Sequence, residues 1–235
     1  MKFKTATIVA NPKKRIAVET KGSVVEFLRK NKIKIMKHGE ILITLGGDGT
    51  LLYNREKFGQ PVFGIGNEKS FICQSNFRNW RKKLAELLSG YRLEKRMMLE
   101  CEIDGRKYKR ALNEVVVRSR DHRVVELVLF VGNRKFEFKA DGVILATPTG
   151  STAYAYSCGA PELSKKTKKY VVVAIAPYRR AFKPLVVDEK TKCSFYLKEG
   201  NADLVIDGQF VHPIELGVKI KVKKSSEYAQ LAQPK

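Results

Sequence analysis

A glycine-rich pentapeptide that carries one acid is the first place in this sequence where chemistry is expected. Gly46-Gly47-Asp48-Gly49-Thr50 follows the apolar run Ile41–Leu45. Glycines permit positive φ and let a bulky anion approach main-chain N–H groups. A helix that begins near Thr50 would direct its positive end to the same place. The pattern predicts a phosphate loop whose amides and Thr50 hold an anion, while Asp48 acts on a hydroxyl nucleophile.

The alternative for this loop is a tight turn in which Asp48 only caps a helix. Two better-known phosphate loops are missing from the sequence, because it contains no GxxxxGK[ST] motif. Gly64-Ile65-Gly66 also lacks the third glycine of a dinucleotide fingerprint, since Lys69 stands in its place. A phosphotransferase built on this chain would use neither loop.

The pair Asn113-Glu114 is unusual because it lies within the apolar run Ala111–Val117, which is expected to form a strand. Burying such a pair without partners would cost several kcal/mol. One interpretation directs it at sugar hydroxyls or at a metal-bound phosphate. The other is a solvent-facing residue beside a hydrogen bond in the core.

A third polar segment follows a strand that opens with Asp141-Gly142 and ends at Thr147-Pro148. Thr149-Gly150-Ser151-Thr152 then offers hydroxyl groups and a new helix start, which predicts a second anion or base-edge site. Tyr154 is placed to stack on a purine. Asp207-Gly208 reads as a hairpin turn.

Strands and helices alternate over residues 1–90, where strands are expected at 5–10, 33–35, 41–45 and 62–65 and helices at 16–30, 50–57 and 80–88. This order predicts an α/β domain with a Rossmann-like, doubly wound parallel sheet.

Residues 91–222 are rich in strand patterns, with hairpin turns at Asp104-Gly105 and Gly132-Asn133. A single strand is expected over Tyr108–Arg118, and only Ser151–Cys158 has a helical pattern. We expect a β-rich sandwich domain here. Residues 223–235 are expected to form a short C-terminal tail that returns to the first domain.

The chain is strongly basic, with 46 Lys and Arg against 24 Asp and Glu and a net charge of +22. Such a field attracts polyanions. The basic residues are dispersed in short groups, as in Lys13-Lys14-Arg15, which is typical of solvated faces. No recognition helix or RNP-like strand is visible, so a specific nucleic-acid partner is not expected.

No apolar stretch approaches the roughly 18 residues that span a bilayer, and no signal peptide opens the sequence. We therefore expect a cytoplasmic protein without a membrane partner. Four scattered cysteines form no C-x-x-C pair, so neither a zinc site nor another protein-bound metal is expected.

Taken together, the polar segments resemble the motifs of the NAD kinase family in order and spacing. The matching motifs are Gly46-Gly47-Asp48-Gly49-Thr50, Ala111-Leu112-Asn113-Glu114, Asp141-Gly142, Thr147-Pro148-Thr149-Gly150-Ser151-Thr152-Ala153-Tyr154 and Asp207-Gly208-Gln209. Lipid kinases and phosphofructokinases of the same superfamily share the first motif. The second and fourth motifs are more specific.

The resemblance implies phosphorylation of the adenosine-ribose 2′-hydroxyl of NAD, with ATP or polyphosphate as donor and Mg²⁺ or a similar divalent cation. It also implies a homo-dimer or homo-tetramer of two-domain subunits, with the nucleotide in a cleft and partly held by a neighbouring subunit. Asp48 would orient or deprotonate the hydroxyl. The other residues implied are Gly46, Gly47, Gly49 and Thr50 for donor phosphates, Asn113 and Glu114 for ribose, Thr152, Ala153, Tyr154 and Ser157 for adenine, Asp141 for the nicotinamide end, and Asp207 for a further contact on the ribose or nicotinamide side.

Arg55, Lys139 and Arg179 are candidates to share charge neutralisation with the cation. One segment departs from the family: its glycine-rich G-I-N-x-G-x-L-G-F stretch is replaced by Gly64–Ile72, in which two glycines are lost and Phe71 stands for the family's Phe. This departure leaves a second interpretation, a kinase of the same superfamily that acts on a lipid or another hydroxyl. The third interpretation is a basic nucleic-acid-binding protein.

Overall fold

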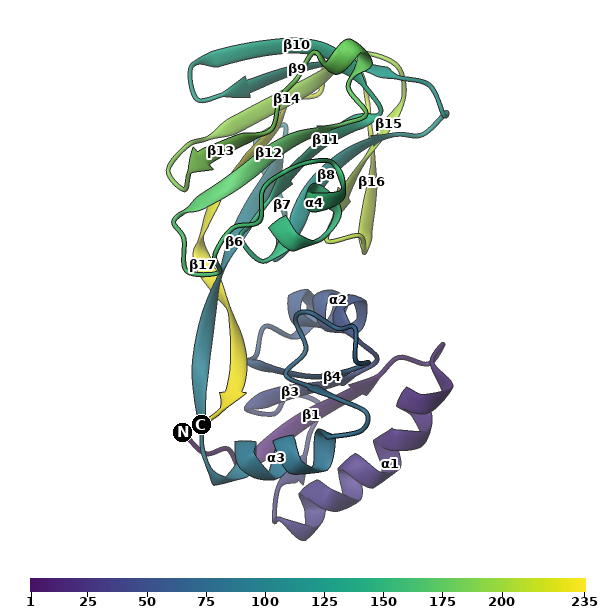
Figure 1. Cartoon of the computed structure of the whole chain (residues 1–235). Helices are drawn as coiled ribbons and strands as arrows, with labels where there is room; N and C mark the ends of the chain where they lie inside the picture. The colour runs from purple at the N-terminus through teal and green to yellow at the C-terminus, as the bar shows by residue number, and fades with distance from the viewer. The chain divides into compact units, whose positions relative to one another are not determined.

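The computed structural model describes the backbone of residues 1–235 and every side chain except those of residues 56–58. The chain divides into two compact units (Figure 1). The first unit comprises Met1–Lys95 and Ala229–Lys235, and the second comprises Arg96–Tyr228. Within the part of the chain that is described, none of the helices combines the length and the apolar character needed to span a bilayer.

The first unit is built on a parallel sheet in the order β5-β4-β3-β1-β2. Its strands are β1 (Thr5–Ala10), β2 (Lys34–Ile35), β3 (Ile41–Leu45), β4 (Val62–Gly66) and β5 (Ser75–Asn76). Strand β17 (Ile220–Pro234) joins β4 in parallel through the pair Leu231 and Val62. The residues expected to form a tail therefore lie in a strand.

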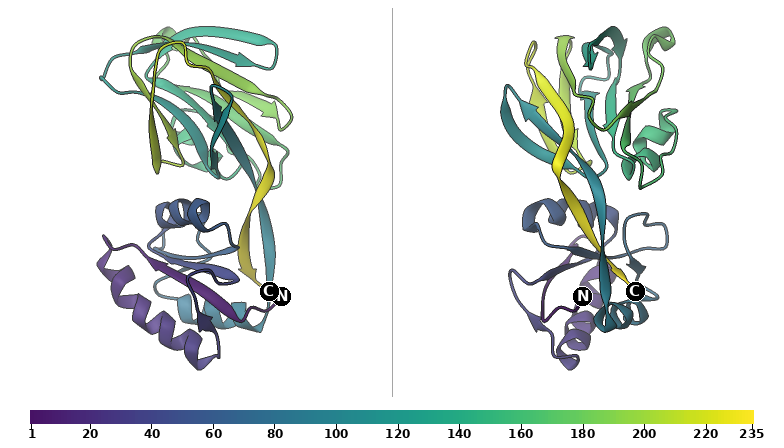
Figure 2. Two further views of the ribbon diagram at one scale, coloured as in Figure 1. Left: turned by 180° about the vertical axis from the view of Figure 1, so that it is seen from behind. Right: turned by 90° about the vertical axis from the view of Figure 1, so that its left-hand side faces the viewer.

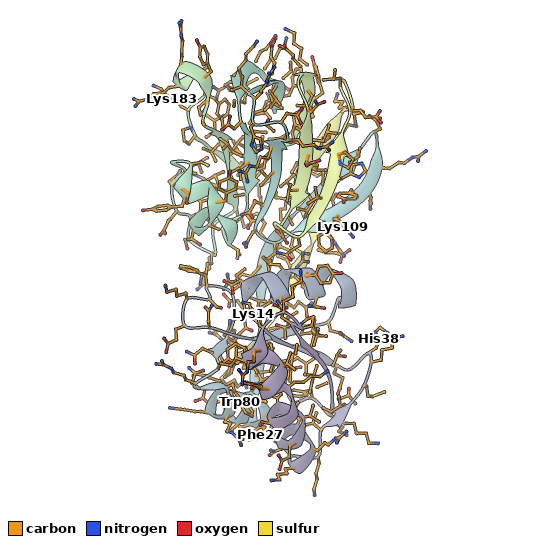
Figure 3. The ribbon with its side chains drawn as sticks, turned by 90° about the vertical axis from the view of Figure 1, so that its right-hand side faces the viewer. Lys14, Phe27, His38, Trp80, Lys109 and Lys183 are labelled. Carbon is orange, nitrogen blue, oxygen red and sulfur yellow. The ribbon has the colours of Figure 1, made fainter. Side chains whose placement is uncertain are left out.

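Helices cover both faces of this sheet (Figure 1). On one face, α1 (Arg15–Lys30) and α3 (Trp80–Ser89) meet through the rings of Phe27 and Trp80, whose centroids lie 5.8 Å apart (Figure 3). The other face carries α2 (Asp48–Phe58), which begins two residues before the expected start. The prediction of an α/β domain is confirmed at this level.

The second unit consists of two sheets, named here the β9 sheet and the β8 sheet, which lie face to face (Figure 2). The β9 sheet contains β6 (Tyr91–Ile103), β7 (Arg106–Ala111), β9 (Val125–Val131), β10 (Arg134–Ala140), β14 (Cys193–Glu199) and part of β17. The β8 sheet has the order β13-β12-β11-β8-β15-β16. Its strands are β8 (Glu114–Ser119), β11 (Gly142–Ala146), β12 (Lys169–Ile175), β13 (Leu185–Asp188), β15 (Ala202–Ile206) and β16 (Phe210–Ile214).

Alternating residues from both sheets form one hydrophobic core, as strands with one buried face require. Phe195 of β14 and Tyr170 of β12 are among its largest members. Both expected hairpins are confirmed, because Ile103 pairs with Arg106 and Val131 pairs with Arg134. The prediction of a β-rich second half is therefore confirmed.

The single strand expected over 108–118 is wrong. The chain bends at Leu112-Asn113, because it leaves β7 in the β9 sheet there and enters β8 in the β8 sheet. The helix expected over 151–158 is also divided, into the short turns η1 (Gly150–Thr152) and α4 (Tyr154–Ser157). A further short turn, η2 (Tyr178–Arg180), was not expected.

Replacing Phe195 by alanine should destabilise the protein by about 3–5 kcal/mol, the usual cost of removing a buried aromatic ring from a core. Urea unfolding followed by circular dichroism measures the change. Val211→Ala is the matched control, because this side chain is 60% exposed and should cost less than about 1 kcal/mol. Equal losses in the two variants would contradict the assignment of the core.

Candidate active site

Two positions of the glycine loop in the first unit favour glycine, Gly46 through lack of space and a positive φ and Gly47 through its positive φ. Gly46 and Gly47 have φ values of 150° and 109°. A Cβ on Gly46 would lie 2.4 Å from Thr50 Oγ1 and 2.8 Å from Asn11 Cβ. Asn11 Nδ2 also donates a hydrogen bond of 3.1 Å to Thr50 Oγ1, which ties the loop to the end of β1.

Asp48, the first residue of α2, uses its carboxylate to hold a neighbouring segment. Oδ2 accepts a hydrogen bond of 2.7 Å from Phe71 N, and Oδ1 accepts bonds of 3.0 and 3.2 Å from Ile72 N and Cys73 N. The N-cap residue of this helix is Gly47 and not Asp48. The thiol of Cys73 also hydrogen-bonds to this carboxylate, which has about four acceptor positions in all.

The thiol of Cys73 lies in the same place without being reactive. Burial and then the charge of Asp48 raise the pKa of this thiol far above its ordinary value. It stays protonated near neutral pH and is therefore no nucleophile. Its sulfur also leaves no space for a side chain at Gly64 of β4, because a Cβ there would lie 2.8 Å from Cys73 Sγ.

Lys14, which precedes α1, contacts the glycine loop, and the sequence analysis did not identify it as a site residue. Its Nζ donates to the Gly46 carbonyl and lies 3.4 Å from where a Cβ on Gly47 would be (Figure 3 labels Lys14). The sequence placed Lys14 among dispersed surface lysines. The signal that could have found it is topological, because Ala10 pairs with Leu45, so the segments that follow β1 and β3 meet at one sheet edge.

A second cluster forms in the second unit around Asp207. This buried residue follows β15 with a left-handed φ of 53°. Its carboxylate accepts hydrogen bonds from the backbone N–H groups of Leu112 at 2.9 Å, Asn113 at 2.7 Å and Glu114 at 3.2 Å. Asp207 therefore holds the bend between β7 and β8 in place.

The loop after β11 packs on the same bend. Thr147 Oγ1 donates to the Leu112 carbonyl at 2.5 Å and accepts from Thr149 N and Gly150 N at 3.1 and 3.2 Å. A Cβ on Gly150 would lie 2.2 Å from the Asn113 carbonyl oxygen, so only glycine fits there. Two motifs that lie far apart in the sequence are thus fastened to each other.

The side chains of Asn113 and Glu114 carry acceptors that nothing in the described structure satisfies. Asn113 Oδ1 and Glu114 Oε2 are buried and have no hydrogen-bond partner among the described residues. Burial, and secondarily the charge of Asp207, raise the pKa of Glu114 to about 8. Buried polar atoms of this kind are rare and call for a partner. A protonated Glu114 can both donate to and accept from a ligand hydroxyl.

The remaining residues of the Thr-Gly-Ser-Thr-Ala-Tyr motif continue from this cluster into η1 and α4. Tyr154 is half-buried, and burial raises its pKa above the ordinary value. Thr152 is half-buried, whereas Ala153 and Ser157 are exposed. The structure therefore leaves parts of this segment open to a ligand.

Four other predicted residues are not gathered into these clusters. Asp141 precedes β11 whereas Thr147 follows it, a separation of roughly 20 Å at about 3.3 Å per residue. Arg179 is exposed in η2, after β12, at the same strand ends as Asp141. Lys139 forms ion pairs of 3.4 and 3.3 Å with Glu126 and Glu199 in the β9 sheet. Arg55 is buried in α2.

Glu114 should make stability depend on pH. Its pKa is about 8 in the folded chain and ordinary in the unfolded chain. Between these values the folded state keeps a proton that the unfolded state has released, so the free energy of unfolding falls as pH rises, by up to about 1.4 kcal/mol per pH unit. Glu114→Gln should remove this slope between pH 5.5 and 7.5 in urea unfolding.

The exposed Glu162→Gln is the matched control and should keep the wild-type slope. Parallel pH dependences in the wild type and in Glu114→Gln would show that Glu114 is ionised throughout.

Comparison with known proteins places this arrangement in a family. The family model described as "ATP-NAD kinase C-terminal domain" matches residues 112–233. A NAD kinase of Methanosarcina barkeri is 32% identical over 211 residues, covering 87% of this chain and 74% of the relative. A NAD kinase of Clostridium perfringens is 31% identical over 220 residues, covering 88% and 80%.

Solved structures share the fold. An NAD kinase from Archaeoglobus fulgidus in complex with ATP superposes with a TM-score of 0.84 at 24% identity, covering 98% of this chain and 94% of the other. Yeast NADH kinase complexed with NADH gives a TM-score of 0.86 at 20% identity, covering 100% and 84%. The matched family model and the similarity to the curated relatives show that this chain belongs to the NAD kinase family.

Proposed function

We propose that this chain transfers a phosphoryl group from ATP or polyphosphate to the 2′-hydroxyl of the adenosine ribose of NAD, which yields NADP. Family membership supports the reaction class, since the matched relatives are named NAD kinases. The observation that carries the acceptor assignment is the pair of buried, unsatisfied oxygens, Asn113 Oδ1 and Glu114 Oε2.

Those oxygens suit a sugar better than an anion. A ribose hydroxyl can donate to Asn113 Oδ1, and it can both accept from and donate to a protonated Glu114. An anionic ligand group would instead meet the nearby charge of Asp207. Thr152, Ala153, Tyr154 and Ser157, which follow in the same loop, are proposed to surround the adenine.

The glycine loop is proposed to hold the phosphoryl donor. Backbone amides of Gly46, Gly47 and Gly49 and the hydroxyl of Thr50 are groups of the kind that bind phosphate oxygens. Lys14, whose ammonium lies against this loop, adds a positive charge for the transferred group.

Asp48 is proposed to orient the nucleophile and accept its proton. Backbone N–H groups donate two hydrogen bonds to Oδ1 and one to Oδ2, so the carboxylate is held in a fixed orientation, and Oδ2 is the oxygen with fewer backbone donors. A fixed acceptor lowers the cost of aligning the hydroxyl with the phosphoryl group. No covalent intermediate with the chain is required for this reaction.

A divalent cation fits this loop as part of the metal–nucleotide complex. Mg²⁺ usually keeps several waters and binds through one or two carboxylates together with substrate phosphates. Asp48 is the carboxylate of this loop, and its Oδ2 is assigned to the hydroxyl, so donor phosphates and waters would supply most ligands of the cation. When bound, the cation neutralises charge on the phosphoryl oxygens.

We further propose a homo-oligomer of this chain. Asp141 lies at the opposite end of β11 from the cluster around Asp207. It is therefore assigned to the nicotinamide end of an extended dinucleotide. A neighbouring subunit would hold part of that dinucleotide. Sedimentation analysis distinguishes a dimer from a tetramer.

Asp48→Asn should lower kcat about 10²–10⁴-fold, because it removes the proton acceptor and changes little volume. The assay follows NADP formation from NAD with ATP and Mg²⁺, and NAD binding should remain nearly unchanged. Asp188→Asn, an exposed residue of β13, is the matched control and should keep wild-type turnover. Retention of more than about a tenth of wild-type turnover by Asp48→Asn would contradict the role of base.

The same assay, run as a matrix of donors and acceptors, tests the reaction itself. ATP and polyphosphate are compared as donors, and NAD, NADH and simple alcohols are compared as acceptors. Phosphorylation of another alcohol with no NADP formed would favour a lipid or nucleoside kinase of the same superfamily.

Lys14→Met should lower kcat/KM for the donor about tenfold to a hundredfold, because it removes a charge that stabilises the phosphoryl group in transfer. Its exposed neighbour Lys13 provides the control, since Lys13→Met removes the same charge away from the loop carbonyl. A similar loss in both variants would mean that Lys14 acts only through the general field of the protein.

A further inference from the structure

A lysine-lined groove lies on the β9 sheet of the second unit. The cavity has a volume of about 320 Å³, and Lys192, Lys219, Lys221 and Lys223 are among the residues that line it. None of these residues belongs to the glycine loop or to the cluster around Asp207. The groove thus has no part in the reaction proposed above.

The strand pattern explains why the lysines gather. Lys221 and Lys223 are two residues apart in β17, so their side chains leave the same face of the sheet, and Lys219 stands one residue before this strand. The residues between them, Ile220 and Val222, point into the core. Across the sheet, Ser194 of β14 pairs with Lys221 in register and contributes a hydroxyl to the groove.

The charge in this groove is only partly compensated, because the one carboxylate among its lining residues is Glu102. Lys223 forms ion pairs of 2.9 Å with Glu102 and 3.2 Å with Glu100. Among the described residues, the side chains of Lys192, Lys219 and Lys221 form no ion pair or hydrogen bond. Glu102 lines the same groove, and its pKa is lowered by its hydrogen bond to Lys223 and by the charges of Lys223 and Lys221. This single lining carboxylate offsets only part of the charge of the four lysines, so the groove keeps a net positive charge.

The types of side chain that line the groove indicate which kind of ligand it can bind. No aromatic side chain lines the groove, so it offers nothing on which a nucleobase could stack. Its cations are lysines, which are point charges on flexible stems, and not the planar arginine forks that grip a single phosphate in two places. Several mobile point charges in a row suit a chain of phosphates.

We propose that this groove binds a linear oligophosphate anion through Lys192, Lys219 and Lys221. The recognised group is a run of linked phosphates, whether in inorganic polyphosphate or in the tail of a nucleoside triphosphate. This inference does not depend on the proposed reaction, since the groove contains none of the residues assigned to it.

The test is isothermal titration of the full chain with tripolyphosphate at about 0.15 M salt, where surface charges are substantially screened. The groove variant is Lys192→Gln/Lys219→Gln/Lys221→Gln. The matched control is Lys21→Gln/Lys34→Gln/Lys82→Gln, which removes the same charge from dispersed, exposed lysines of the first unit. The groove variant should bind one equivalent of tripolyphosphate fewer than the wild type, or bind that equivalent with about tenfold lower affinity. The control variant should bind tripolyphosphate as the wild type does.

Parallel titrations with ATP and AMP distinguish the sources of the phosphates. If the groove variant also loses an ATP site, the groove binds the triphosphate tail of a nucleotide as well. If it loses only the binding of tripolyphosphate, the groove is specific for inorganic polyphosphate chains. AMP, with one phosphate, should show no difference among the three proteins. Equal weakening in the groove and control variants, or no change in either, would overturn the proposal.

Folding and the donor loop are checked independently. Thermal unfolding should show that both triple variants are folded, and their kcat and KM for ATP should match the wild type. Because the titrations measure binding, they are decisive even if the protein forms no NADP. The titrations therefore test phosphate binding in the groove, and the activity assay separately tests the proposed reaction.

Discussion

The arrangement of both clusters depends on a carboxylate that accepts hydrogen bonds from three consecutive backbone N–H groups. Asp48 binds the amides of residues 71–73, and Asp207 binds those of residues 112–114. Bonds to a charged acceptor are shorter and stronger than those between neutral groups. Asp48 thus fixes a segment without regular secondary structure, and Asp207 fixes the bend that leads into β8. The two acids nevertheless have different tasks, because Asp207 is buried whereas Asp48 is only half-buried.

Asp207 and Glu114 lie close together, yet their surroundings favour the ionised form of Asp207 and the neutral form of Glu114. Three peptide dipoles surround Asp207, whereas Glu114 Oε2 has no donor among the described residues. Burial without donors disfavours the ionised form, and the charge next to it disfavours that form further. The protein can therefore present a neutral carboxyl group to a ligand while a buried carboxylate holds the scaffold.

Much of the fold could be predicted from local patterns. Apolar runs that alternate with helical periodicity indicated the α/β half, and Asp104-Gly105 and Gly132-Asn133 indicated the hairpins of the other half. The sequence could not show that the apolar run around Asn113 changes sheets, because periodicity is the same on both sides of the bend. The reason for the bend is a long-range contact with Asp207, 94 residues away from Asn113.

The candidate site was predictable where several unusual residues stood together, as in Gly46–Thr50 and Thr147–Tyr154. Isolated residues were harder to find. Lys14 looked like one of many surface cations, and only the pairing of β1 with β3 brings it to the glycine loop. Lys139 had the same appearance in the sequence, yet it lies in a network of ion pairs on the β9 sheet. In such a basic chain, the strand pairing and not the residue type distinguishes a site lysine such as Lys14 from a surface lysine such as Lys139.

The pairing of Leu231 with Val62 has a consequence for biosynthesis. On the ribosome, β4 is made long before the strand that pairs with it. Until the segment around Leu231 emerges, β4 lacks this backbone partner and shows an unpaired edge, a hazard for association with other chains. The second unit depends on the same strand, because β17 pairs with β14 through residues 220–222. Both units therefore wait for the C-terminal strand before their sheets are complete.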